Sequence, residues 1–130
     1  MIDERRVGVL SDTLLYDDAN AFATELRDEL PTKKQLMGLL TYSRRRGDLN
    51  RYIENRISRA ISKPFYDALK QRLKKLEERV RTEWQPRYQF WAAGLTKIQE
   101  RDVAEEWLTA LVREFVRHVV AEALRYAPEK

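Results

Sequence analysis

Residues 62–84, SKPFYDALKQRLKKLEERVRTEW, decide the fold class. Apolar side chains recur in this stretch at spacings of three and four residues, which places them on one face of an α-helix. Proline is tolerated in the first turn of a helix, so Ser62 and Pro64 mark the start, and Pro86 ends or kinks the helix. The stripe spans about six turns and predicts one long helix of a bundle. It consists of Phe65, Leu69, Leu73, Leu76, Val80 and Trp84.

The N-terminal half predicts shorter helices. Residues 1–16 show no helical pattern and are expected to be irregular, which assigns the helical domain to residues 17–130. Thr32 and Gln35 have the form of a capping box at the start of the helix that follows. Gly47 is expected to end that helix, and Asp48 is expected to cap the next one.

The C-terminal part carries the widest apolar face of the chain. A short helical stretch is expected at residues 88–98, and a long last helix at residues 103–126 with Asp102 at its start. An apolar face this wide indicates a central helix touched by several neighbours. We therefore expect an all-α fold, a bundle of five to six helices with one long central helix pair. The wide face consists of Trp107, Leu111, Phe115 and Val119, with Val112, Val116, Val120 and Leu124 beside them.

The composition excludes several classes of protein. The chain has 130 residues, of which 43% are hydrophobic and 35% charged, enough for one folded domain with a core. Cysteine is absent, which removes disulfides and thiolate metal sites, and His118 is the single histidine. No apolar run approaches a membrane span and no signal peptide is seen, so we expect a cytoplasmic protein that does not enter the membrane. No phosphate-binding loop or nucleophile motif occurs, so we expect no catalytic residue, no metal and no cofactor.

Charge is distributed unevenly along the chain. Residues 1–32 carry three basic and eight acidic side chains, a net charge of −5. Residues 33–87 carry sixteen basic and six acidic side chains, a net charge of +10. Residues 88–130 carry six basic and seven acidic side chains, a net charge of −1. A polyanion is therefore attracted to the middle of the chain, although a solvated helix surface is the other interpretation of such basic residues.

The basic side chains of the middle form short stripes at helical spacing. Two such stripes could meet across a helix pair and form a groove that contacts a phosphate backbone without reading bases. Tyr42 and Tyr52 lie close enough in sequence to stack on unpaired bases; packing against the bundle is the other interpretation. The two stripes are Arg56, Arg59 and Lys63, and then Arg72, Lys75 and Arg79; they are preceded by a triplet of consecutive arginines, Arg44, Arg45 and Arg46.

A resemblance to a known family rests on two stretches, LPTKKQLMGLL at residues 30–40 and DLNRYIENRISR at residues 48–59. The long helix and the apolar last helix fit the same family. Over residues 30–126 the layout resembles the small helical subunits of CRISPR effector ribonucleoprotein complexes, which serve antiviral defence. The acidic residues 1–30 are not part of that pattern. The resemblance implies a non-catalytic subunit that stacks with other subunits, or with copies of itself, and contacts single-stranded RNA or DNA. The contacts it implies are Arg44, Arg45, Arg46, Arg51, Arg56, Arg59 and Lys63.

Two other functions fit the same residues. In the first, the chain is a helical assembly module without nucleic acid, whose acidic first thirty residues dock on the basic middle of a neighbouring copy. In the second, residues 32–61 form a helix-turn-helix that binds a duplex. The resemblance leaves open which strand is bound: guide RNA, target strand or displaced strand.

Overall fold

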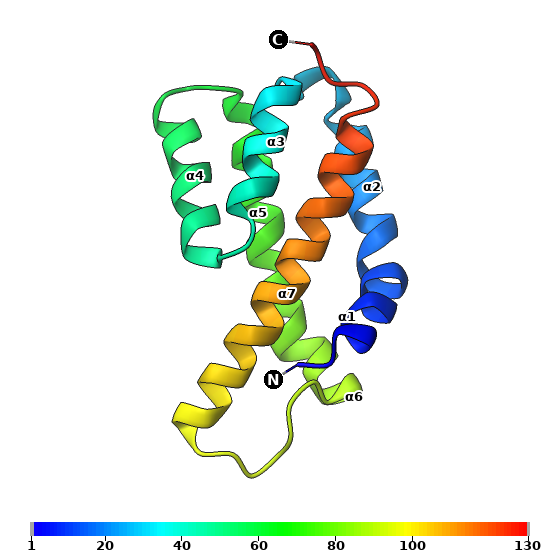
Figure 1. Ribbon diagram of the computed structural model, residues 1–130, viewed down its shortest axis with the longest axis vertical. Coiled ribbons are helices and arrows are strands. Elements are labelled where there is room, and N and C mark those ends of the chain that lie inside the picture. The colour runs from blue at the N-terminus through cyan, green and yellow to red at the C-terminus, as the bar shows by residue number, and fades with distance from the viewer. Residues whose placement is uncertain (1, 130) are drawn as a thin grey trace.

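Helix α7, Lys97–Ala123, is the central element of the computed structural model, which describes residues 2–129 (Figure 1). It packs most extensively on α2 (Tyr16–Glu25) and also contacts α3 (Lys33–Tyr42) and α5 (Lys63–Arg79). Its apolar face is buried, except that Leu124, just past the helix end, is half-buried. The predicted central helix is therefore confirmed.

The start of α7 differs from the prediction. Thr96 caps the helix: its hydroxyl accepts from the Gln99 amide, and the Gln99 side chain accepts from the Thr96 amide. Asp102 lies inside the helix, so the expected start there is wrong. The expected helical stretch at residues 88–98 is also wrong, because Gln89 and Gly94 have positive φ and residues 89–96 form a loop.

The long helix predicted from residues 62–84 is present and slightly longer. It runs from α5 through a π-helical turn, η3 (Val80–Trp84), into α6 (Gln85–Tyr88). All six residues of the predicted stripe are buried. Pro86 lies in α6 directly after the π-turn, and the helix continues past it to Tyr88, so Pro86 does not end the helix as one of the two predicted outcomes had it.

The N-terminal segment is helical from Glu4 onward, so the expectation that residues 1–16 are irregular is wrong. Asp3 caps α1 (Glu4–Leu10), and a π-helical turn, η1 (Ser11–Leu15), joins α1 directly to α2. The buried residues Leu10 and Leu15 are five positions apart, a spacing that a regular α-helix does not place on one face. The extra residue of the π-turn restores the common face, which is why the α-helical pattern missed this helix. Met1 lies outside the described residues.

Helices α3 and α4 (Arg46–Ser58) form a helical hairpin on the edge of the bundle opposite α2 (Figure 1). Thr32 caps α3 as predicted, since its hydroxyl accepts from the Gln35 amide at 3.3 Å. The Gln35 side chain accepts from the Ser62 hydroxyl at 3.5 Å, so among residues 2–129 the predicted capping box is only half formed. Gly47 and Asp48 both lie in the first turn of α4, whose N-cap is Arg45. The predicted helix stop at Gly47 and the cap at Asp48 are therefore wrong.

The all-α fold class is confirmed. The chain is 79% helical, and within residues 2–129 the structure contains no strand. Apart from a 3-10 turn, η2 (Arg27–Glu29), the helices form five continuous stretches, and the two longest are residues 63–88 and α7.

Candidate nucleic-acid interface

The turn between α3 and α4 exposes two arginines. Arg44 follows the last turn of α3, and Arg45 is the N-cap of α4 with an extended backbone. Both side chains are exposed, and neither has an ion-pair partner within residues 2–129. Free guanidinium groups at a turn can form bidentate, charge-assisted hydrogen bonds to phosphates.

Arg46, the third member of the triplet, points into the bundle instead. It is the first residue of α4, where a cation is unfavourable beside the positive end of the helix dipole. Its guanidinium forms ion pairs with Glu77 of α5 and Glu105 of α7. Burial lowers the pKa of Arg46, with the positive charge of Arg81 acting in the same direction and Glu105 acting against it. Arg46 joins three helices and is not available as a surface contact.

The outer face of α4 carries Arg51, Arg56 and Arg59. The Arg51 side chain is 82% exposed and pairs with Asp48 at 2.7 Å. Arg59 is exposed at the end of α4 and has no ion pair in the described part of the chain. Arg56 is half-buried, donates to the Asn55 side chain at 3.0 Å, and its Nε is buried without a hydrogen-bond partner.

Tyr42 and Tyr52 stack beside these arginines. Their ring centroids are 5.0 Å apart with an interplanar angle of 26°, and the Arg56 guanidinium lies 5.0 Å from the Tyr52 centroid. These residues line a shallow hollow of about 340 Å³, which we name the hairpin hollow. It is formed by Tyr42, Asp48, Arg51, Tyr52, Asn55 and Arg56.

The inner ring of this stack is held in place from three sides. The Tyr52 hydroxyl donates to the Gln35 carbonyl at 2.9 Å, and its ring meets the edge of Tyr66 at 6.1 Å. A Cβ at Gly38 would lie 2.8 Å from the Tyr52 hydroxyl, so glycine provides the space for it. Burial raises the pKa of the Tyr66 hydroxyl.

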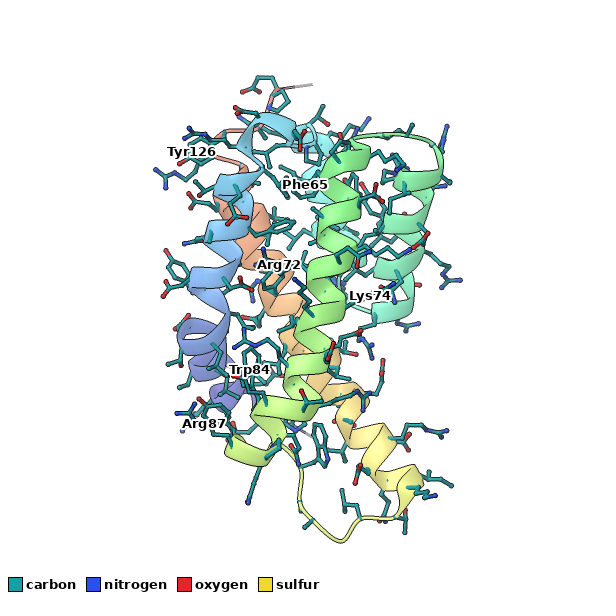
Figure 2. The ribbon with its side chains drawn as sticks, turned by 180° about the vertical axis from the view of Figure 1, so that it is seen from behind. Phe65, Arg72, Lys74, Trp84, Arg87 and Tyr126 are labelled. Atoms are coloured by element: carbon teal, nitrogen blue, oxygen red, sulfur yellow. The ribbon has the colours of Figure 1, made fainter. Side chains whose placement is uncertain are left out.

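Arg72 belongs to a different surface from the α4 arginines. It forms an ion pair with Asp18 of α2 and lies 5.3 Å from the centroid of the Phe22 ring. Figure 2 shows Arg72 on the side of α5 that faces α2 and Lys74 on the side that faces α4. The predicted basic stripes of α4 and α5 therefore do not meet in one groove.

The remaining predicted cations of α5 are scattered along its exposed side. Lys63 pairs with Asp67 at 2.8 Å, and Arg79 pairs with Glu83 at 3.1 Å. Hydrogen bonding from Arg79 lowers the pKa of Glu83. Lys75 is exposed and has no ion pair among residues 2–129.

A pocket of about 220 Å³ does lie between α4 and α5, but its charges are mixed. Lys70 pairs there with Glu54, and Lys74 lines the same pocket. Neither lysine was singled out from the sequence. Residues 72 and 74 lie 200° apart around a helix, so Lys74 and Arg72 cannot share a face, and this spacing was the signal that could have found Lys74. The polar lining consists of Arg46, Asn50, Glu54, Lys70, Lys74 and Glu77.

His118 contacts the N-terminal helix. Its Nε2 lies 2.6 Å from the buried Ser11 hydroxyl, and its ring meets the edge of Tyr16 at 5.2 Å. The neighbouring acid Glu114 pairs with Arg117, and Glu122 pairs with Arg125, which lies just past the end of α7. His118 thus ties α7 to the π-turn.

Comparisons with protein-family models, curated proteins and solved structures find no match to this chain. Within residues 2–129, every helix is too short or too polar to cross a lipid bilayer. The same residues contain no group of three or more His, Asp or Glu side chains placed to hold a metal ion.

Proposed function

We propose that this chain is a non-catalytic subunit that binds the backbone of single-stranded RNA or DNA through the exposed side of the α3–α4 hairpin. We call this surface the hairpin face; it comprises Tyr42, Arg44, Arg45, Arg51, Tyr52, Arg56 and Arg59. The resemblance to the small helical subunits of CRISPR effector complexes suggests that such a subunit works inside a ribonucleoprotein. Chemistry would then reside in other subunits.

The observation that carries this proposal is the absence of ion pairs at Arg44 and Arg45 in the described residues. Arg46, next in sequence, is held by two carboxylates, whereas the two arginines before it are exposed at a turn. An uncompensated cation attracts phosphate and releases its counterions on binding. Arg59 extends this uncompensated charge to the end of α4, and Arg51 lies on the same helix in an exposed pair with Asp48.

Fluorescence anisotropy with labelled single-stranded RNA, single-stranded DNA and duplex DNA tests the proposal at several salt concentrations. We expect every single strand to bind regardless of sequence, with affinity falling as salt rises. The double variant Arg44→Ala/Arg45→Ala should lower the salt slope for single strands by about 1.4, or roughly 0.7 for each lost phosphate contact.

The matched control is Arg5→Ala/Arg27→Ala, which removes the same charge from exposed arginines outside the hairpin face. This control should keep most of the wild-type affinity. Equal loss in both double variants would mean that net charge alone drives binding and would contradict an interface at the hairpin face. Absence of binding at low salt would reject the function.

Self-assembly without nucleic acid is a second candidate, supported by the placement of opposite charges. Asp17 of α2, and Asp28 and Glu29 of the η2 turn that follows α2, are exposed without ion pairs among residues 2–129, and α2 forms the edge opposite α4 (Figure 1). Docking of this acidic edge on the hairpin face of another copy would form an open chain. Sedimentation velocity at low salt would then show species larger than a monomer, which Asp17→Asn/Asp28→Asn should reduce.

A further inference from the structure

We propose that the hairpin hollow binds one unpaired nucleobase, stacked on Tyr42, with the adjoining phosphate held by Arg51. This inference rests on the proposed function and adds to it a contact with the base. Backbone contacts alone do not distinguish a strand with bases from one without them. A stacking site does make that distinction, and it does so for every base because every base has a π-face.

Tyr42 has the exposure and the support that a stacking platform needs. It is 48% exposed, while the ring behind it, Tyr52, is fixed by its hydrogen bond to Gln35 and its edge contact with Tyr66. A base placed on Tyr42 would extend an existing aromatic stack. Because Tyr52 holds the outer ring in position, little conformational freedom is lost when the base arrives.

The polar groups around the rings suit a nucleotide. Arg56 lines the hollow, and its Nε is a buried donor without a hydrogen-bond partner in the described part of the chain. A buried donor of this kind gains from any acceptor that a ligand brings. Its partner Asn55 lines the same hollow.

Arg51 can exchange its present partner for a phosphate. Its side chain is 82% exposed and its ion pair with Asp48 lies on the surface of the first two turns of α4. Exposed pairs of this type contribute little, so a phosphate, which offers bidentate acceptors, can replace Asp48. Arg44 and Arg45, on the turn that follows Tyr42, would then hold neighbouring phosphates of the same strand.

The test compares an intact oligonucleotide with an abasic one of the same length, which keeps every phosphate and removes every base. Anisotropy should show the wild-type protein binding the intact strand at least about fivefold more tightly than the abasic strand, since one stacked base contributes that much or more. Tyr42→Leu should bind both strands equally, and Tyr42→Phe should restore the preference. Tyr126→Leu is the matched control, because Tyr126 is an exposed tyrosine far from the hollow in sequence.

The outcomes separate this inference from the proposed function. Equal affinity of the wild-type protein for intact and abasic strands, with loss of both in Arg44→Ala/Arg45→Ala, would overturn the base contact and leave backbone binding in place. A preference that survives in Tyr42→Leu would also overturn the stacking site. Failure of the wild-type protein to bind either strand would overturn both. Thermal unfolding checks that Tyr42→Leu is folded, which we expect because the ring that it removes is half exposed.

Discussion

Arg56 and Arg59 on α4 and Arg72 on α5 belong to stripes with the same helical spacing. They differ in what surrounds them. On α4, Arg59 is exposed without an ion pair among residues 2–129, and Arg56 borders the hairpin hollow. On α5, Arg72 is joined to Asp18 and lies over Phe22. Spacing determines which face of a helix a cation occupies. The element packed against that face determines whether its charge remains available to a ligand.

The first prediction concerns the contact between α2 and α5, which we call the α2–α5 seam, and has the largest expected effect. Phe22 is 2% exposed and contacts Phe65 and Phe115, so Phe22→Ala should lower the free energy of unfolding by about 3–5 kcal/mol. Tyr42→Ala, which removes a half-exposed ring from the hairpin face, should cost about 1 kcal/mol or less. Urea denaturation followed by circular dichroism measures both. Equal costs would show that the hairpin face is as much part of the core as the seam.

The second prediction concerns adjacent arginines with opposite environments. Arg46→Met removes the group that joins Glu77 and Glu105, and should lower the free energy of unfolding by about 2 kcal/mol. Arg45→Ala should leave stability nearly unchanged, because its side chain is exposed and unpaired within the described residues. The same pair of variants should reverse order in strand binding, with Arg45→Ala the weaker binder. A loss of stability at both positions would contradict the division of the triplet.

The third prediction compares two glycines within the α3–α4 hairpin. A Cβ at Gly38 would lie 2.8 Å from the Tyr52 hydroxyl, whereas a Cβ at Gly47 would meet nothing within 4 Å. Gly38→Ala should therefore destabilise by about 1 kcal/mol, the loss of a typical hydrogen bond. Gly47→Ala, in the first turn of α4, should stabilise by about 0.5–1 kcal/mol through helix propensity. Destabilisation by Gly47→Ala would show that the turn needs a glycine for a reason other than space.

Much of this fold is predictable from local pattern. The stripe from Phe65 to Trp84 and the wide face of α7 specify buried sides without knowledge of the partner, because regular helices repeat every 3.6 residues. The pattern failed where that period changes. The spacing of five between Leu10 and Leu15 hides a continuous helix behind a π-turn.

The candidate site was less predictable because pairing of charges depends on tertiary contacts. Glu77 lies 31 residues and Glu105 lies 59 residues from Arg46, so nothing local indicates that this arginine is neutralised. Asp18 lies 54 residues from Arg72. By contrast, Tyr42 and Tyr52 lie on two helices joined by a short turn, so their closeness was predictable from the sequence, although their stacking on each other was not.

The fourth prediction has the smallest effect and asks whether Arg79 belongs with the free cations or the neutralised ones. Its guanidinium lies 4.7 Å from the Trp84 centroid and its Nε donates to Glu83 at 3.1 Å, which lowers the pKa of Glu83 from its ordinary value of 4.5. A lowered carboxyl pKa means that the pair stabilises the fold above the ordinary pKa and that this contribution disappears as the pH falls through the lower folded value. A carboxyl NMR titration should place the Glu83 midpoint below that of an unstructured glutamate, with the difference shrinking in 1 M salt because the pair is exposed. Arg79 also lies on α5, outside the hairpin face, so Arg79→Ala should leave strand affinity at the wild-type level. A Glu83 titration midpoint at or above the ordinary pKa would mean that Glu83 does not pair with Arg79 in solution. Arg79 would then be an unpaired surface cation like Arg59.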